Sequence, residues 1–113
     1  MKNSFRSLFV WNASVDLAVS VLEYTEELIA RRRYGLSRQL ETSSVSVPSN
    51  IAEGTGRRSL RERRRFLDIA RGSLYELETQ LEICRRRNLL DAGRYAAMRH
   101  TIAQIGAGLS RML

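Results

Sequence analysis

The chain has 113 residues, of which 43% are hydrophobic and 27% charged, with seven glycines and one proline. This length suits a single domain over residues 1–113, and the composition excludes a disordered, collagen-like or multidomain protein. Nineteen basic residues, eighteen of them arginine, stand against twelve acidic ones and give a net charge of +7. Acidic partners, nucleic acid first among them, are therefore expected.

Cys84 is the only cysteine and His100 the only histidine. One cysteine cannot form an intramolecular disulfide, and the two residues offer too few ligands for a Cys/His metal site. No uncharged run approaches the roughly 20 residues that span a bilayer. Lys2 and Arg6 precede an apolar run, as in a signal peptide, but polar residues interrupt that run and we interpret it as mature protein. A cytoplasmic protein without membrane contact, metal or cofactor is expected.

Residues 8–31 carry two apolar stripes at helical spacing. The first stripe comprises Trp11, Val15, Ala18, Leu22 and Ile29. The second lies about 100° around the same helix by the 3.6-residue period and comprises Val10, Leu17, Val21, Tyr24 and Leu28. Because one bundle core needs only one stripe, we interpret the second as an oligomer interface. A helix that is covered broadly within one chain is the alternative.

A second helix is predicted over residues 36–53, after a stop at Gly35, since glycine is favoured just past a helix end. Pro48 within it lacks the amide that would bond the Ser44 carbonyl, so a kink or a broken turn is expected there. The nearby serines can satisfy freed backbone groups, which gives them a structural rather than a catalytic role. The predicted core positions are Leu36, Leu40, Ser43 or Ser44, Val47 and Ile51.

Gly54-Thr55-Gly56 ends this helix, and Ser59 with Glu62 forms a capping-box signature for the next one, predicted over 59–88. Its apolar stripe comprises Phe66, Ala70, Ser73, Leu74, Leu77, Leu81 and Cys84. A last helix over 91–112 has the most regular repeat, with Tyr95, Met98, Ile102, Ile105, Leu109 and Met112. Four amphipathic helices with short connections predict an all-α, antiparallel up-down-up-down four-helix bundle.

The positive charge is concentrated in residues 31–65, which carry +7, against −2 before them and +2 after them. Arginines at a helix start oppose the helix dipole unless an anion occupies the site. The helical period places Arg57, Arg61 and Arg64 nearly opposite Phe66, facing solvent. A solvated face without a ligand is the alternative interpretation. The residues predicted to bind nucleic-acid phosphates are Arg57, Arg58, Arg61, Arg64 and Arg65.

Candidate catalytic groups do not form a recognisable arrangement of nucleophile, base and orienting residue. The Gly54 to Ser59 segment lacks the spacing and the lysine of a phosphate-binding loop. Ala97 stands three residues before His100, where di-iron bundles carry a glutamate. We therefore expect no enzymatic activity.

The run Val47-Pro48-Ser49-Asn50-Ile51-Ala52-Glu53-Gly54-Thr55-Gly56-Arg57-Arg58-Ser59, with Ala70-Arg71-Gly72-Ser73-Leu74 further on, resembles the four-helix bundle proteins encoded in intervening sequences of bacterial 23S rRNA genes. The resemblance implies a four-helix bundle, a homopentamer in some members, with no established enzymatic activity. The architecture is also similar to the accessory proteins of diversity-generating retroelements, which are basic pentamers thought to bind nucleic acid. Arg63 departs from the family pattern, which often has an aromatic or aliphatic residue there.

Physical reasons link several of these motif residues to the fold. Glu53 can reach Arg57 across one helical turn. Gly72 and Ser73 in mid-helix would let a neighbouring helix approach closely, despite a cost near 1 kcal/mol for the glycine. The predicted structural motif residues are Asn50, Glu53, Gly54, Gly56, Ser59, Glu62, Gly72 and Ser73.

Two functions remain open at this point. The first is a non-enzymatic homo-oligomer, pentameric by resemblance, that binds RNA or DNA backbone through the arginines without reading bases. The second is an oligomeric protein-interaction scaffold that does not bind nucleic acid.

Overall fold

The computed structural model describes residues 5–113, and residues 1–4, including Lys2, lie outside this range. A short 3-10 helix, η1 (Phe5–Ser7), precedes α1 (Phe9–Ala30), α2 (Tyr34–Thr55), α3 (Leu60–Arg86) and α4 (Ala92–Met112). The described part of the chain contains no strand. The predicted all-α class and the four helices are confirmed, and no observed helix end differs from its predicted position by more than two residues.

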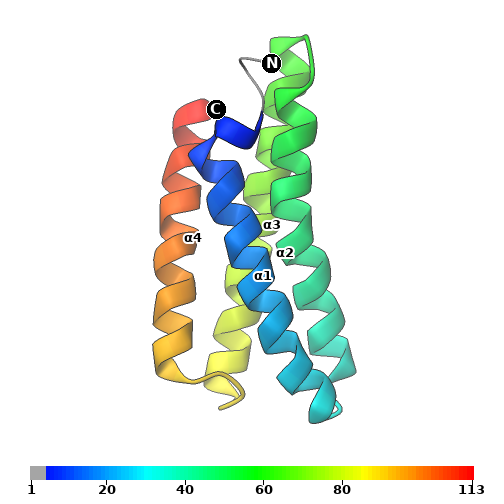
Figure 1. Cartoon of the computed structure of the whole chain (residues 1–113), viewed down its shortest axis with the longest axis vertical. Coiled ribbons are helices and arrows are strands. Elements are labelled where there is room, and N and C mark those ends of the chain that lie inside the picture. Colours follow the sequence, from blue (N-terminus) through cyan, green and yellow to red (C-terminus); the bar gives the residue numbers. More distant parts are fainter. Residues whose placement is uncertain (1–4) are drawn as a thin grey trace.

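Successive helices run in opposite directions along the long axis of a 44 × 22 × 22 Å molecule (Figure 1). α1 packs against α2 and α4, and α3 packs against the same two helices. The α2–α3 corner lies at one end of the molecule, beside η1 and the end of α4 (Figure 1). The α1–α2 and α3–α4 turns, which hold the arginine runs 31–33 and 85–87, lie at the other end.

The core stripes of α2, α3 and α4 were predicted with few errors. Five of the seven predicted core residues of α3 are buried, and the other two, Phe66 and Ser73, are half-buried. The buried five are Ala70, Leu74, Leu77, Leu81 and Cys84. On α4 the repeat is buried from Met98 to Leu109, whereas Met112 at its end is 36% exposed. None of the described helices is long and apolar enough to cross a membrane.

The predicted oligomer interface on α1 is wrong. Its five residues, Val10, Leu17, Val21, Tyr24 and Leu28, are at most 4% exposed within the single chain and form part of its core. The stripe that we expected in the core is instead partly exposed, with Leu22 at 37% and Ile29 at 43%. Two polar residues, Ser14 and Thr25, lie on the buried side, where their hydroxyls donate to the carbonyls of Trp11 and Leu22.

The buried side of α1 is also tied to the α3–α4 turn. The Tyr24 hydroxyl donates a hydrogen bond to the Leu89 carbonyl oxygen over 2.8 Å. Burial raises the pKa of the Tyr24 phenol, so this donor keeps its proton at any ordinary pH. A tyrosine that is 1% exposed therefore serves the core of one chain and cannot contact a second subunit.

A kink or a broken turn was expected at Pro48, and α2 continues through this residue, so the broken turn is absent. The serines before the proline make local bonds: Ser44 donates to the Glu41 carbonyl oxygen, and Ser43 donates to the Gln80 side-chain oxygen of α3 over 2.7 Å. The hydroxyls that were expected to have a structural role thus hold polar contacts within α2 and across to α3.

Two helix ends are made by non-glycine residues in the left-handed conformation. Arg32 after α1 has φ 62°, and Asn88 after α3 has φ 59°. In both turns the amide of the next residue donates a hydrogen bond to the carbonyl oxygen five residues earlier. These bonds run from Arg33 to Leu28 and from Leu89 to Cys84. Gly35 lies inside the first turn of α2 and does not end α1, contrary to the sequence-based expectation.

Candidate nucleic-acid interface

The arginine-rich region surrounds the corner where α2 gives way to α3. Ser59 caps α3, because its Oγ accepts a hydrogen bond from the Glu62 amide over 3.0 Å. The Glu62 carboxylate pairs with Arg65 at 3.2 Å. The capping signature therefore positions the helix start and also places a carboxylate among the arginines.

Phe66, which is half-buried, is the contact point for two of the five predicted arginines. The Arg57 guanidinium lies 4.8 Å from the centre of the Phe66 ring, and the Arg65 guanidinium lies 4.6 Å from it. Arg57 also pairs with Glu53 over 2.8 Å, the contact that the sequence suggested. The expectation that Arg57 points away from Phe66 is wrong, because Arg57 lies in the turn before α3 and does not follow the helical period of α3.

The other three predicted arginines have a different environment. Arg58, Arg61 and Arg64 are exposed, and none of their side chains makes a hydrogen bond or ion pair within residues 5–113. From the sequence, all five arginines were predicted to bind phosphates in the same way. The structure separates two arginines that are committed to carboxylates and an aromatic ring from three whose donors remain available to a ligand.

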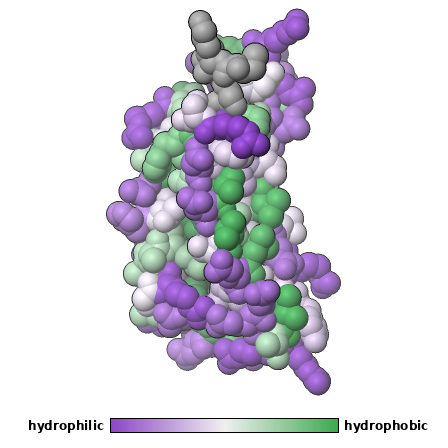
Figure 2. All heavy atoms as spheres, in the orientation of Figure 1, coloured by the Kyte–Doolittle hydropathy of each residue, from purple (hydrophilic) through white to green (hydrophobic). Residues whose placement is uncertain are grey.

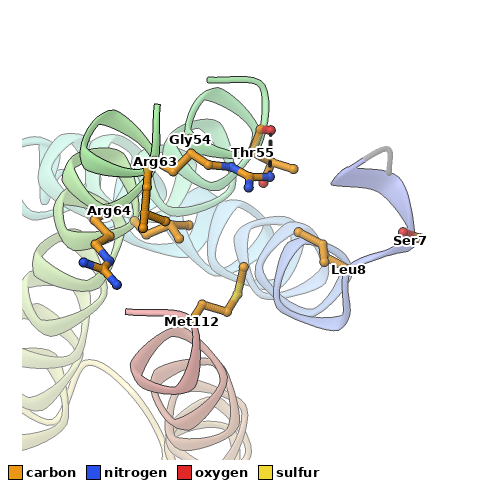
Figure 3. A pocket seen from close by; sticks show the side chains of 9 residues that line it. Ser7, Leu8, Gly54, Thr55, Arg63, Arg64 and Met112 are labelled. Atoms are coloured by element: carbon orange, nitrogen blue, oxygen red, sulfur yellow. Dashed lines mark hydrogen bonds between the residues drawn. The ribbon is translucent and has the colours of Figure 1, made fainter. Parts of the chain in front are cut away.

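Arg63 is exposed and directs its guanidinium to the Thr55 carbonyl oxygen at the end of α2, at 3.5 Å. In Figure 3 the side chains of Arg63 and Arg64, although adjacent in sequence, extend in different directions. Arg63 thus spans the α2–α3 corner.

Three of the motif residues, Asn50, Gly54 and Ser73, contribute to the contact between α2 and α3. Asn50 donates to the carbonyl and the hydroxyl of Ser46, and Ser46 bonds the hydroxyl of Ser73 over 2.8 Å. A Cβ at Gly54 would lie 3.0 Å from the Phe66 Cβ and 3.1 Å from the Arg63 carbonyl oxygen. Only a glycine lets the two helices approach this closely.

The two other motif glycines have no such requirement. A Cβ at Gly72 would meet no atom within 4 Å, and the residue is exposed on α3. The prediction that Gly72 admits a neighbouring helix of the same chain is therefore wrong. Gly56 sits in the exposed turn after α2, where a Cβ would make ordinary contacts with the last carbonyls of that helix.

A pocket of about 370 Å³ opens beside these arginines, at the end of the bundle. Its apolar lining comes from Leu8, Leu60, Leu67 and Met112, and its polar lining from Ser7, Thr55, Arg63 and Arg64 around Gly54 (Figure 3). We call it the end pocket. Three regions far apart in the sequence, residues 7–8, residues 54–67 and Met112, contribute to it, so no local pattern could have predicted it.

The remaining chemically reactive groups do not gather. Among the described residues, no group of three His, Cys, Asp or Glu side chains is arranged to hold a metal ion. His100 is exposed on α4. Burial raises the pKa of the Cys84 thiol, which therefore stays protonated in the core.

Comparison with known proteins adds the family. Residues 6–111 match the family described as 23S rRNA-intervening sequence protein. The chain belongs to this family. The match covers nearly all of the chain and agrees with the resemblance carried by the 47–59 motif.

A solved structure shows the same fold as this intervening-sequence protein. It is a protein of unknown function from the S23 ribosomal protein family of Bacteroides thetaiotaomicron, superposing with a TM-score of 0.84 at 24% identity. The alignment covers 88% of this chain and 94% of the other. No curated protein matches the chain. The family thus fixes the fold, and the arginine cluster is the feature from which a function can be argued.

Proposed function

We propose that this intervening-sequence family protein is a non-enzymatic, cytoplasmic protein that binds RNA or DNA through the phosphate backbone. The observation that carries the proposal is the set of three exposed, unpaired arginines, Arg58, Arg61 and Arg64, at the start of α3. Guanidinium groups form forked hydrogen bonds with phosphate oxygens, which suits them to this ligand.

The position of these arginines supports an anionic ligand. The first turn of α3 contains one acidic residue, Glu62, and its carboxylate is paired with Arg65. A cation near a helix N-terminus opposes the dipole and costs about 0.3–1 kcal/mol at low salt. A bound phosphate reverses this interaction, because the dipole and the guanidinium groups then attract the same charge.

Binding of this kind is sequence-independent. Backbone contacts position a protein on nucleic acid, whereas reading of sequence needs contacts with base edges. Arg57 and Arg65, each held by a carboxylate, contribute less free positive charge than the three unpaired arginines. We therefore assign the main phosphate contacts to Arg58, Arg61 and Arg64.

The test is fluorescence polarisation of a labelled structured RNA across a salt series from about 50 to 200 mM. The variant Arg58→Ala/Arg61→Ala/Arg64→Ala is compared with Arg31→Ala/Arg33→Ala/Arg87→Ala, which removes the same charge from the other end of the bundle. We expect the first variant to flatten the log-log salt slope by about 2 to 3, at roughly 0.7–0.9 per lost contact. Equal slopes for both variants would refute the assignment to this corner.

A second candidate function is an oligomeric protein-interaction scaffold, and exposed apolar residues on α1 and α2 favour it. Val19, Leu22 and Ile29 on α1 and Val45 on α2 are 37–50% exposed. Figure 2 shows hydrophobic surface gathered on the face that these two helices present in that view. We call these four residues the apolar band, and propose it in place of the buried stripe as the contact surface of a homo-oligomer, pentameric by family resemblance.

The two functions rest on different residues, the three unpaired arginines for nucleic-acid binding and the apolar band for the scaffold. They are separated by the same RNA titration. A folded oligomer that binds no RNA at about 50 mM salt would refute nucleic-acid binding and support the protein-interaction scaffold.

A further inference from the structure

The end pocket adjoins the proposed phosphate-binding arginines, and Arg64 belongs to both. We propose that the end pocket receives one unstacked base of a single-stranded nucleic acid whose phosphates contact Arg61 and Arg64. This inference rests on the proposed function and adds to it the class of nucleic acid that is bound.

The lining of the end pocket suits a flat ring. Leu67 is buried and forms an apolar wall, while Leu60, 59% exposed, and Met112, 36% exposed, stand at its rim. Arg63 is held at 3.5 Å from the Thr55 carbonyl oxygen, which keeps its planar guanidinium group at the wall. Bases stack on apolar and guanidinium surfaces of this kind when they leave a helix. A volume of about 370 Å³ falls within the usual range for small-ligand pockets.

The charge beside the pocket indicates what the base is attached to. Arg64 extends away from Arg63 (Figure 3) and has no partner within residues 5–113. Arg61 is exposed one turn before it on α3 and is also unpaired. An apolar pocket flanked by free guanidinium groups matches a nucleotide, in which an uncharged ring is linked to a phosphate.

The bases of an intact duplex are stacked and paired and cannot enter such a pocket. A single strand, a loop or a bulge presents bases that are already unstacked. The inference therefore predicts that the protein prefers single-stranded to double-stranded nucleic acid of the same length.

The test measures binding of a mixed-sequence 12-nucleotide RNA and of the corresponding RNA duplex by fluorescence polarisation at one salt concentration. Met112→Trp fills the end pocket from its exposed rim, and Ile83→Trp adds the same bulk on α3 at a residue outside the pocket lining. We expect Met112→Trp to weaken single-strand binding on the order of tenfold, because the indole ring would occupy the space of the base. Duplex binding should not change, and Ile83→Trp should match the unaltered protein with both ligands.

Each other outcome has a clear meaning. Unchanged single-strand binding by a folded Met112→Trp protein overturns the base pocket and leaves backbone binding intact. Absence of binding to either RNA by the unaltered protein overturns the proposed function and this inference together. Decanoate binding that Met112→Trp abolishes, with RNA binding unchanged, would make the pocket an amphiphile site and overturn the inference. If Met112→Trp does not fold, Leu60→Trp fills the pocket from a more exposed position.

Discussion

The Arg57 guanidinium lies 4.8 Å from the centre of the Phe66 ring while the same side chain pairs with Glu53 over 2.8 Å. This arrangement joins the last turn of α2 to the first turns of α3 through one cation. Gly54 completes it, because a Cβ at that position would lie 3.0 Å from the Phe66 Cβ. Contacts of Arg57 with Glu53 and Phe66, together with the absence of a side chain at Gly54, therefore build this corner.

Gly54→Ala is expected to destabilise the protein by about 1–3 kcal/mol, the range for overpacking in a close contact. The new methyl group would lie 3.1 Å from the Arg63 carbonyl oxygen, a backbone atom that cannot move aside without shifting α3. Urea denaturation followed by circular dichroism measures the change in the free energy of unfolding.

Gly72→Ala is the matched control for that substitution. It adds the same methyl group in mid-helix with no atom within 4 Å, so it should stabilise the protein by up to about 1 kcal/mol through helix propensity. A Gly54→Ala protein as stable as the original would contradict the close-approach argument. Destabilisation by Gly72→Ala would mean that another molecule covers this face of α3.

The helices and most of the core were predictable because three helices each carry one clear apolar stripe. α1 carries two stripes, and the period alone cannot say which of them is buried. The choice depends on tertiary contacts, such as the bond from the Tyr24 hydroxyl to the Leu89 carbonyl 65 residues away. The buried side also holds two hydroxyl residues, Ser14 and Thr25, so it is not marked by apolar residues alone.

The position of the arginine cluster was predictable from the sequence, but which of its arginines are paired was not. The distribution of charged residues along the sequence located the positive charge in residues 31–65, with six arginines within residues 57–65. Whether an arginine is paired depends on where the turn before α3 directs Arg57 and on the position of Phe66. The end pocket was not predictable at all, since its lining comes from η1, the start of α1, the α2–α3 corner and the end of α4.

Comparing Val19→Asp with Val21→Asp tests separately whether an α1 residue is needed for association between chains or for folding of one chain. Val19 is 50% exposed in the apolar band, whereas Val21 is 0% exposed in the core. We expect Val19→Asp to stay helical, with a free energy of unfolding within about 1 kcal/mol of the original, and to lower the mass seen by light scattering. Val21→Asp should lose several kcal/mol or fail to fold, because it buries a charge without a partner.

The mass measurement decides the role of the apolar band. A Val19→Asp protein with the same mass as the unaltered protein would contradict the proposed role of this surface in a homo-oligomer. A folded Val21→Asp protein would contradict the core assignment of the second α1 stripe.

Arg61→Ala/Arg64→Ala should make the free protein more stable while weakening RNA binding. Both arginines lie in the first turns of α3, where a cation opposes the helix dipole by about 0.3–1 kcal/mol each. Alanine also has the higher helix propensity. Thermal unfolding at low salt should therefore show a higher midpoint than the original, and added salt should shrink the difference. A lower midpoint would mean that these arginines make stabilising contacts within the protein.

Three charges join α1 to the start of α4. Arg94 bonds Glu27 on α1 over 3.0 Å, and it also pairs with Asp91, whose carboxylate caps α4 by accepting from the Arg94 amide over 2.9 Å. These hydrogen bonds hold the pKa of Asp91 below its ordinary value of 3.8, the backbone amide of Arg94 contributing most. The Arg94 guanidinium likewise holds the pKa of Glu27 below 4.5.

The lowered pKa values make the attachment of α4 sensitive to acid. A carboxyl group whose pKa is lower in the folded state stabilises that state above its unfolded pKa, and the effect is lost as pH falls through the folded pKa. The protein should therefore keep its thermal midpoint down to about pH 5 and lose stability below about pH 4.

Asp91→Asn retains a capping side chain but removes the charge, so it should lower the midpoint at pH 7 and reduce its dependence on pH below 5. Asp16→Asn, which removes an exposed charge that has no ion pair within residues 5–113, is the control and should keep the original pH dependence. An Asp91→Asn protein with the same acid-induced loss as the Asp16→Asn control would show that the charge of Asp91 does not stabilise the bundle.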